Sequence, residues 1–471
     1  MRSRGIAPPS LDAIVTIFLA LAGWHANLNP ISDNSTFCHL RTGQWMLAHG
    51  LPRIDIFSFT AAGTPWVPES WLADFAYGAF DRAVGPVGLI LFNAAIGATI
   101  GALWYRLARR ITHDTFRATM ISVVSLAATY TLWSPRPLML GILALLVLVY
   151  IVELPDSAAG RRPMLLMPPL FWLWANTHGS FVLGFAYLAL HLIGRRLEGA
   201  PLSRGRERDL LIAGAIALAV CFINPYGYRL LAAPFHLAAR YQALSGVVEW
   251  RHASIASVQG IAYLVWIAVF SAAILTRPRE IGIRGFVVAI PFLALGLWAE
   301  RNIAIAPIAM FPIVARAWAA PAEAAANRRA FNWAMAVLAA VLAIAWTDPV
   351  FRRPGLDFAG YPVAAMRSIA ARGLLGSRLL STDKWGGYIV LNYGPQQRVF
   401  MDDRYDVYPQ NLTIDMSELL NKRGNWPQTV RKYGIDVVVW PAADPSVDTL
   451  GDIPGWKKIF QDRDAVVFSK R

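Results

Sequence analysis

The residues between Asn29 and Gly50 place several chemically active side chains directly after the first apolar segment of the chain. The stretch NPISDNSTFCHLRTGQWMLAHG contains an acid, two histidines and an arginine. The carboxylate of Asp33 could act as a general base, since burial near a membrane surface would raise its pKa toward the working range. The same residue could instead cap a helix, because Ser32, Asp33 and Asn34 are all of types favoured at that position.

Further candidates follow in the next fifty residues. Glu69, in WVPESWL, and Asp55 could supply a second acid or hold a divalent cation, and the alternative is that both are solvated loop charges. His39 could orient Asp33 or bind a leaving phosphate, and the alternative is a structural histidine at the membrane interface. No cysteine and histidine spacing of a zinc site is present, so the identity of any metal stays unknown.

Three later positions also carry charge or hydrogen-bonding groups in apolar surroundings. His178 lies in the polar turn NTHGS between two short apolar runs, where a histidine is costly unless it has a function such as binding phosphate or sugar. Arg301 follows Glu300 at the end of an apolar run. Its planar guanidinium could clamp a lipid phosphate, and the alternatives are an ion pair with Glu300 or an arginine reaching out to the interface. Arg404, in FMDDRYDVY, could bind substrate or belong to a structural salt-bridge network.

The elements that must position these residues are mostly membrane helices. The chain of 471 residues is 56% hydrophobic and only 16% charged, which is typical of a polytopic membrane protein. Runs of span length indicate about eleven transmembrane helices. They lie near residues 11 to 29, 87 to 105, 118 to 134, 137 to 153, 164 to 176, 179 to 194, 210 to 224, 258 to 276, 285 to 300, 303 to 318 and 330 to 347.

The net charge of +14 reflects topology and does not indicate nucleic-acid binding. The loops on the side of the N-terminus carry more arginines than the longer loops on the opposite side, which is the bias of cytoplasmic loops. We therefore expect a cytoplasmic N-terminus. An odd number of spans then places the C-terminal segment outside the cytoplasm.

Two segments are expected to fold outside the membrane on that outer side. The first outer loop, residues 31 to 86, is long and rich in aromatic residues, and HLRTGQWMLAHG and WLADFAYGAF have the spacing of amphipathic interfacial helices. All lysines of the chain lie beyond residue 347, so we expect a membrane domain at 1–347 and a small α/β domain at 348–471. That domain should contain helices at 363–371 and in SELLNKRGNWPQTVRKYG, strands in RLLST, RVFMD, DVVVW, WKKIFQD and AVVFSK, and a helix or strand in GGYIVLN.

The motifs of the first outer loop resemble those of a known family. The pattern D-x3-F-x-HL-x2-G, followed by P-x2-D-x-FS-x-T-x2-G-x-PW and then WL, is similar to the first outer loop of bacterial GT-C-type membrane glycosyltransferases that depend on polyprenyl phosphate. NTHGSFVLG, INPYG with VVEW, and AERNIAIAPI are similar to later segments of that family. The resemblance implies many spans, a large first outer loop with an acid just after the first span, and a C-terminal domain on the outer face.

The C-terminal segment carries a second, weaker resemblance. STDKWGGYIVLNYGPQQRVFMDDRYDVY is similar to the segment of oligosaccharyltransferase catalytic subunits in which a tryptophan-rich turn precedes a strand and an R-x-D element. This implies substrate-binding roles for Trp385, Tyr388 and Arg404. The acceptor-reading motif of those enzymes is replaced here by Lys384-Trp385-Gly386-Gly387-Tyr388, so the resemblance does not extend to Asn-linked transfer to protein.

Together the resemblance implies a multi-pass enzyme of the bacterial cytoplasmic (inner) membrane with an extracytoplasmic C-terminal domain. It would move a sugar from a polyprenyl-phosphate donor to a glycan, lipid or protein acceptor of the cell envelope, with Asp33 as general base and a divalent cation as an optional cofactor. Two alternatives stay open, which are a transporter or lipid flippase and a noncatalytic scaffold of the same fold. No detectable inverted repeat supports the transporter.

Overall fold

The computed structural model describes residues 8–130, 132–153, 162–240, 250–321 and 329–470. It is mostly helical and divides into two compact units. We call the first the helical unit; it comprises Met1–Pro30, Val87–Gly227 and Val248–Gly355. The second, the mixed unit, comprises Ile31–Pro86, Tyr228–Val247 and Leu356–Arg471. The boundary expected at residue 347, between a membrane domain and a C-terminal α/β domain, stays a prediction. Of the motifs quoted above, most of VVEW lies outside the described residues.

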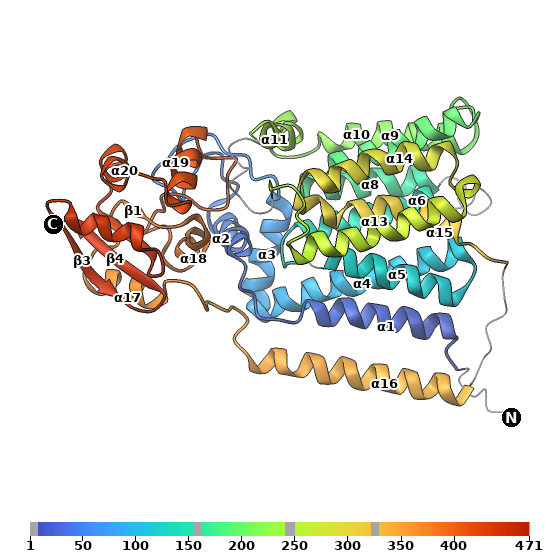
Figure 1. Ribbon diagram of the computed structural model, residues 1–471, viewed down its shortest axis with the longest axis horizontal. Coiled ribbons are helices and arrows are strands. Elements are labelled where there is room, and N and C mark those ends of the chain that lie inside the picture. Colours follow the sequence, from blue (N-terminus) through green and yellow to red (C-terminus); the bar gives the residue numbers. More distant parts are fainter. Residues whose placement is uncertain (1–7, 131, 154–161, 241–249, 322–328, 471) are drawn as a thin grey trace. The chain divides into compact units, whose positions relative to one another are not determined.

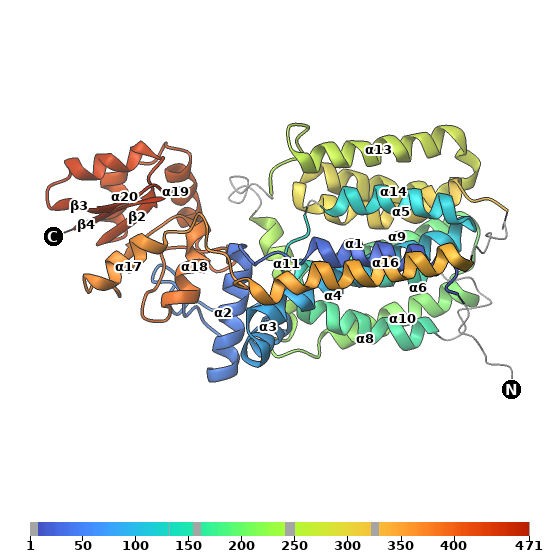
Figure 2. The ribbon, with the colours of Figure 1, turned by 90° about the horizontal axis from the view of Figure 1, so that it is seen from below.

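The helical unit is built from helices that run side by side (Figure 1). Their bounds are α1 Leu11–Ala26, α4 Pro86–Thr112, α5 Thr115–Tyr130, α6 Leu138–Val152, α8 Arg162–Thr177, α9 Phe181–Leu197, α10 Gly205–Cys221, α13 Val258–Thr276, α14 Pro278–Trp298, α15 Ala306–Ala317 and α16 Arg329–Thr347, with the 3-10 turns η2 Glu300–Ala304 and η3 Asp348–Arg352. Figure 2 shows α16 lying along α1, and the indole Nε1 of Trp24 donates a 2.9 Å hydrogen bond to Oγ1 of Thr347 between them.

Every apolar run that the sequence predicts as a span falls on one of these helices. Within the described residues, 4 helices are both long and apolar enough to cross a membrane, namely Pro86–Thr112, Val258–Thr276, Pro278–Trp298 and Ala330–Arg352. Several of the others are shorter than the roughly 20 residues that a perpendicular helix needs to span the hydrocarbon core. The helical, membrane-protein class is therefore confirmed, whereas the number of eleven spans stays a prediction.

The mixed unit combines the first outer loop with the C-terminal segment. Its helices are α2 Asn34–His49, α3 Trp71–Val84, α11 Tyr228–Ala239, α17 Val363–Ala371, α18 Asp383–Tyr393, α19 Gln410–Leu420 and α20 Trp426–Lys432, with the 3-10 turn η4 Pro445–Asp452. Its strands are β1 Leu379–Leu380, β2 Val437–Pro441, β3 Trp456–Gln461 and β4 Ala465–Lys470. α11 was not predicted from the sequence. Nη1 of Arg240, just beyond its end, donates to the carbonyl groups of Tyr405, Asp406 and Tyr408.

The sheet of the mixed unit has the strand order β1-β2-β4-β3. β1 pairs parallel to β2, because the helices α18 to α20 connect them, and β4 pairs antiparallel to both β2 and β3. The central strands β2 and β4 are buried along almost their whole length. β3 is an edge strand that exposes Lys457 and Lys458, and edge lysines discourage pairing with another chain.

The structure confirms most of the elements expected in the C-terminal segment and corrects two. The helix at 363–371 and the final hairpin are present, and GGYIVLN is helical. RVFMD is not a strand, because only Val399 pairs, through isolated bridges to Ser58 and Leu379. SELLNKRGNWPQTVRKYG is not one helix. It is interrupted after α19, and α20 begins anew at Asn425, whose side chain caps it by accepting from Gln428 N.

Candidate functional site

Asp33 lies at the start of α2 and caps it. Its Oδ1 accepts hydrogen bonds from the backbone N (2.9 Å) and the Oγ1 (3.2 Å) of Thr36. This is the arrangement expected of an N-cap aspartate, which satisfies an otherwise unpaired N–H of the first helical turn. The carboxylate is half-buried and therefore reachable from outside the mixed unit.

The next residue, Asn34, fixes the start of α2 against α18. Its Nδ2 donates to the carbonyl oxygen of Asp383 (3.2 Å), and its Oδ1 accepts from Gly387 N (2.7 Å). A Cβ atom on Gly387 would lie 2.3 Å from the carbonyl oxygen of Asn34, so only glycine permits this approach. Gly387 of the C-terminal motif thus lets α18 support the helix that carries Asp33.

His39 forms a close pair with Asp74, a residue that the sequence analysis missed. Nδ1 of His39 lies 2.6 Å from Oδ1 of Asp74, which connects α2 to α3. The Asp74 side chain is buried, with 4% exposure, whereas the His39 side chain is 26% exposed. Burial raises the pKa of the Asp74 carboxyl, and the neighbouring His39 partly offsets this. An imidazole held in this way through Nδ1 can present Nε2 to a ligand.

The signal that could have revealed Asp74 is its helical spacing. Asp74 falls on the same face of α3 as the buried residues Tyr77 and Gly78, three and four positions later. The backbones of α2 and α3 touch there, because a Cβ atom on Gly78 would lie 2.4 Å from the carbonyl carbon of Gly43. An acid on an apolar helix face needs a partner, and His39 supplies it.

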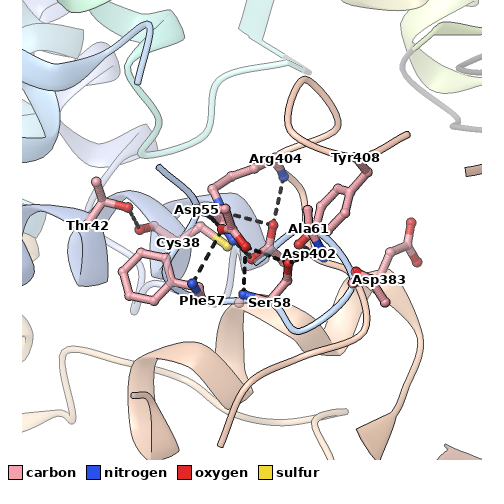
Figure 3. A network of polar contacts seen from close by, with 12 residues as sticks. Cys38, Thr42, Asp55, Phe57, Ser58, Ala61, Asp383, Asp402, Arg404 and Tyr408 are labelled. Atoms are coloured by element: carbon pink, nitrogen blue, oxygen red, sulfur yellow. Dashed lines mark hydrogen bonds and ion pairs between the residues drawn. The ribbon is translucent and has the colours of Figure 1, made fainter. Parts of the chain in front are cut away.

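Asp55, Asp402 and Arg404 form a buried ionic cluster (Figure 3). Nη1 of Arg404 donates to Oδ1 of Asp55 (2.7 Å), and its Nε and Nη2 donate to both carboxylate oxygens of Asp402 (3.0 and 2.7 Å). Ser58 donates to Oδ2 of Asp55 through its backbone N (3.0 Å) and its Oγ (2.6 Å). Two motifs separated by most of the chain therefore meet in one cluster.

The surroundings of Arg404 keep its guanidinium charged. The guanidinium carbon lies 4.6 Å from the ring centroid of Trp66 and 5.0 Å from that of Phe57, so aromatic faces cover it. Burial alone would lower the pKa of Arg404, but Asp402, Tyr408 and Asp55 together hold it well above its usual value. This geometry commits Asp55 and Arg404 to each other, which favours a positioning role over direct contact with a substrate.

The remaining candidates of the mixed unit differ in accessibility. Glu69 lies in the turn before α3 and is half-buried. Trp385 and Tyr388 are buried, with 6% and 3% exposure. Nε1 of Trp385 donates to the carbonyl oxygen of Gly360 (3.0 Å), and the ring of Tyr388 lies 5.5 Å from that of Tyr361. Both aromatic side chains therefore pack inside the mixed unit.

His178 and Arg301 belong to the helical unit. As predicted, NTHGS forms a turn between two helices, α8 and α9. Nδ1 of His178 accepts from Ser180 N (3.1 Å), so the neutral ring carries its proton on Nε2, which can donate to an anionic oxygen. Arg301 lies in η2 with its guanidinium carbon 4.5 Å from the ring centroid of Trp250. The candidate residues are thus divided between the two units.

Among the residues that the structure describes, no group of three or more histidine, cysteine, aspartate or glutamate side chains is arranged to hold a metal ion. The polar groups of the mixed unit nevertheless lie on or around one helix, α2. α2 carries a carboxylate at its start and an imidazole further along, and the ionic cluster and α18 brace the loop and helix around them.

Comparisons with known proteins identify the fold. No protein-family model matches the sequence, and no curated protein matches it either. The structure is similar to that of ArnT from Cupriavidus metallidurans in the apo state, with a TM-score of 0.53 and 13% identity over 97% of both chains. It is equally similar to ArnT bound to undecaprenyl phosphate, with a TM-score of 0.52 and 14% identity over 97% of both chains.

Two further solved structures of glycosyltransferases are similar to this chain. The Archaeoglobus fulgidus oligosaccharyltransferase in the apo form gives a TM-score of 0.52 at 10% identity, covering 91% of this chain and 69% of that one. The arabinofuranosyltransferase AftD from Mycobacteria gives 0.50 at 13% identity, with 97% of this chain matched to 39% of that one. The chain therefore has the fold of GT-C glycosyltransferases, as the sequence resemblance implied. At these identities the likeness establishes the fold and not the activity.

Proposed function

We propose that this chain is a membrane glycosyltransferase that transfers a sugar from a polyprenyl-phosphate-linked donor to an acceptor of the cell envelope. The observation that carries the proposal is the match over 97% of both chains to ArnT, one structure of which is bound to undecaprenyl phosphate. A fold shared over the full length of both chains includes the first outer loop, where this chain has Asp33 at a helix start. Function has to be argued from such a site, since one fold supports several activities.

Asp33 is the proposed general base. Its carboxylate would take the proton of an acceptor hydroxyl while the hydroxyl oxygen forms a bond to the anomeric carbon of the donor sugar. The bond between that carbon and the phosphate oxygen breaks, and polyprenyl phosphate leaves with the electron pair. The half-buried position of Asp33 suits this role, because an acceptor hydroxyl can reach the carboxylate.

His39 is the proposed partner of the leaving phosphate. It follows Asp33 by six residues on α2, a rise of about 9 Å along the helix axis. Asp74 would act through His39 as a positioning residue, since it fixes the orientation of the ring. Glu69 stays a candidate for the second acid. His178 and Arg301 stay candidates for donor binding from the helical unit.

Asp55 and Arg404 are assigned a supporting role in this proposal. Their buried pair joins the first outer loop to the C-terminal segment and so holds the loop that leads to α3. Trp385 and Tyr388 are assigned to the packing that supports α18. Substrate contact by these four residues would require them to leave their partners in the interior, at considerable cost.

The direct test is reconstitution of the full chain in lipid vesicles with a panel of radiolabelled polyprenyl-phosphate sugars. We expect loss of label from one donor, either by transfer to added membrane lipid or by slow hydrolysis. Movement of intact donor between leaflets without cleavage would favour the flippase alternative. Absence of both activities over the whole panel, with intact folding, would favour a noncatalytic protein and contradict the proposal.

A further inference from the structure

A cavity at the end of the helical unit is lined by an unusual concentration of arginine. Its volume is about 550 Å³, and its walls come from the start of α1, the end of α4 and the end of α6. Arg106, Arg109, Arg110 and His113 contribute the nitrogen-bearing groups, and among the described residues that line the cavity Asp12 is the only acid. None of these residues belongs to the candidate glycosyltransfer site, which lies elsewhere in the chain.

The carboxylate of Asp12 is paired with Arg109, so its negative charge offsets that arginine and leaves the charges of Arg106 and Arg110. Oδ1 of Asp12 accepts from the hydroxyl of Tyr105 (2.6 Å), from Nε of Arg109 (2.9 Å) and from Oγ1 of Thr115 (2.9 Å). These three bonds tie α1 to α4 and to the start of α5. The bond to Arg109 uses Nε, so the two terminal Nη groups of its guanidinium are not engaged by Asp12.

The other cations of the cavity are exposed. Arg106 and Arg110 are exposed on the last turns of α4, and the guanidinium carbon of Arg110 lies 5.3 Å from the ring centroid of Tyr150 on α6. His113 follows the end of α4 with φ at 58°, in the left-handed region that favours glycine.

We propose that this cavity binds a phosphate anion. The terminal groups of several arginines form planar forks that match phosphate oxygens, and the positive end of the α1 dipole opens into the same space. The volume accommodates a phosphate with a small polar substituent. Arginines gathered between helix ends on the predicted cytoplasmic side are suited to the headgroup of an anionic phospholipid, and a soluble phosphate compound offers the same chemistry.

The arginine bias of cytoplasmic loops is a simpler explanation for basic residues at this end, and a matched control separates the two. Arg277 and Arg279 are likewise exposed, flank the start of α14 and do not line the cavity. The double variant Arg277→Gln/Arg279→Gln removes the same charge from the same predicted side as Arg106→Gln/Arg110→Gln. Only Arg106→Gln/Arg110→Gln should weaken binding of an anion to a specific site in the cavity.

The test measures binding of phosphatidylglycerol to the purified full chain in detergent micelles, with phosphatidylcholine as the neutral reference. We expect the wild type and Arg277→Gln/Arg279→Gln to prefer phosphatidylglycerol equally. Arg106→Gln/Arg110→Gln should bind it about thirtyfold more weakly, since each arginine near an anionic surface contributes about 1 kcal/mol and a loss of about 2 kcal/mol corresponds to that factor. Thermal unfolding and gel filtration of each variant verify that it is folded.

Inorganic phosphate distinguishes the two sources of the anion. Competition by millimolar phosphate would identify a soluble phosphate compound as the ligand, and failure to compete would identify the lipid headgroup; either result is consistent with the site. The proposal is overturned if both double variants lose the preference to the same degree, because the effect would then be general charge. It is also overturned if the wild type binds neither phosphatidylglycerol nor phosphate more tightly than phosphatidylcholine.

Discussion

Asp55 and Arg404 form a buried ion pair with 2.7 Å between Oδ1 and Nη1, although 349 positions separate them in the sequence. The pair lies between the first outer loop and the C-terminal segment within the mixed unit. Arg404 also donates to both carboxylate oxygens of Asp402. The compactness of the mixed unit therefore depends on charges that are compensated only when both segments are folded together.

Arg404→Met should destabilise the mixed unit by about 3 to 5 kcal/mol, because it leaves the carboxylates of Asp55 and Asp402 buried without their partner. Denaturant unfolding in detergent, followed by the fluorescence of the tryptophans, measures the change. Arg398→Met is the control, since Arg398 is exposed on the same segment and its replacement should change stability by less than about 0.5 kcal/mol. Equal stability of the two variants would mean that the ionic cluster of Asp55, Asp402 and Arg404 contributes nothing to the free energy of unfolding.

Asp33→Asn should abolish sugar transfer and leave the protein folded. Asparagine caps a helix about as well as aspartate but cannot accept the proton of the acceptor. We expect transfer to fall by about a hundredfold to ten-thousandfold, the usual worth of a positioned general base. The measurement is turnover of the donor identified by reconstitution, with thermal stability as the control. Wild-type turnover by this variant would leave Asp33 as a cap and transfer the assignment to Glu69.

His39→Gln and Asp74→Asn should lower kcat/KM for the donor to a similar extent, about tenfold to a hundredfold, because Asp74 acts through His39. The double variant should be no worse than either single one, since residues acting as a unit are not additive. Asp81→Asn is the matched control. Asp81 also bonds from α3 to α2, accepting from Nε2 of Gln44 at 2.9 Å, and its replacement should leave kcat/KM unchanged. Additive losses would indicate separate roles.

Stability of the mixed unit should depend on pH through Asp406. Burial raises the pKa of the Asp406 carboxyl to about 6, from an ordinary value of 3.8, although Arg404 acts in the opposite direction. The folded state therefore binds this proton more tightly than the unfolded state. Its contribution to stability is fully present below the ordinary value and is lost as the pH rises through about 6.

Asp406→Asn should remove this dependence, so that the variant gains stability relative to the wild type between pH 4 and 7, by up to about 3 kcal/mol. The free energy of unfolding measured across that range for both proteins gives the difference. Asp452→Asn, at an exposed carboxylate of the same segment, should follow the wild-type curve. A constant difference between Asp406→Asn and the wild type at all pH values would show that Asp406 does not titrate in this window.

Reporter fusions should locate the membrane sides. On the predicted topology, fusions after Arg110, Arg196 and Arg329 report the cytoplasm, and fusions after Gly85 and at Arg471 report the outside. Gly85 directly precedes α4 and Arg110 lies in its last turn, so these two fusions report the two ends of one of the helices long enough to span. A cytoplasmic C-terminus would remove the compartment shared by Asp33 and the C-terminal segment, and with it the proposed site.

Local patterns in the sequence were sufficient to predict most helices and strands. The helix at Val363–Ala371 and the span at Val258–Thr276 were predicted with the bounds that the structure shows, because their apolar residues repeat with the period of a helix or run without interruption. Asp33 could be named as a helix cap for the same reason, since capping depends on a few neighbouring residues. The GT-C fold was also accessible from the motifs of the first outer loop.

Errors arose where pairing at long range overrides local preference. RVFMD has the composition of a strand, but only Val399 finds partners, because the first outer loop occupies that edge through Ser58. The single helix expected in SELLNKRGNWPQTVRKYG is divided, because Gly424 interrupts it and Asn425 caps a new helix.

The pairings within the candidate site were decided by the tertiary structure alone. Asp74 was recognised as the partner of His39 only when α2 and α3 were packed together, since nothing in a linear sequence specifies which buried acid meets which base. Likewise, Asp55 was named as a second acid or cation ligand and Arg404 as a substrate-binding residue, and only the fold shows that the two form an ion pair. Sequence spacing determines which residues share a helix face, whereas the balance of desolvation and charge pairing that gives a buried group its role depends on neighbours brought together by folding.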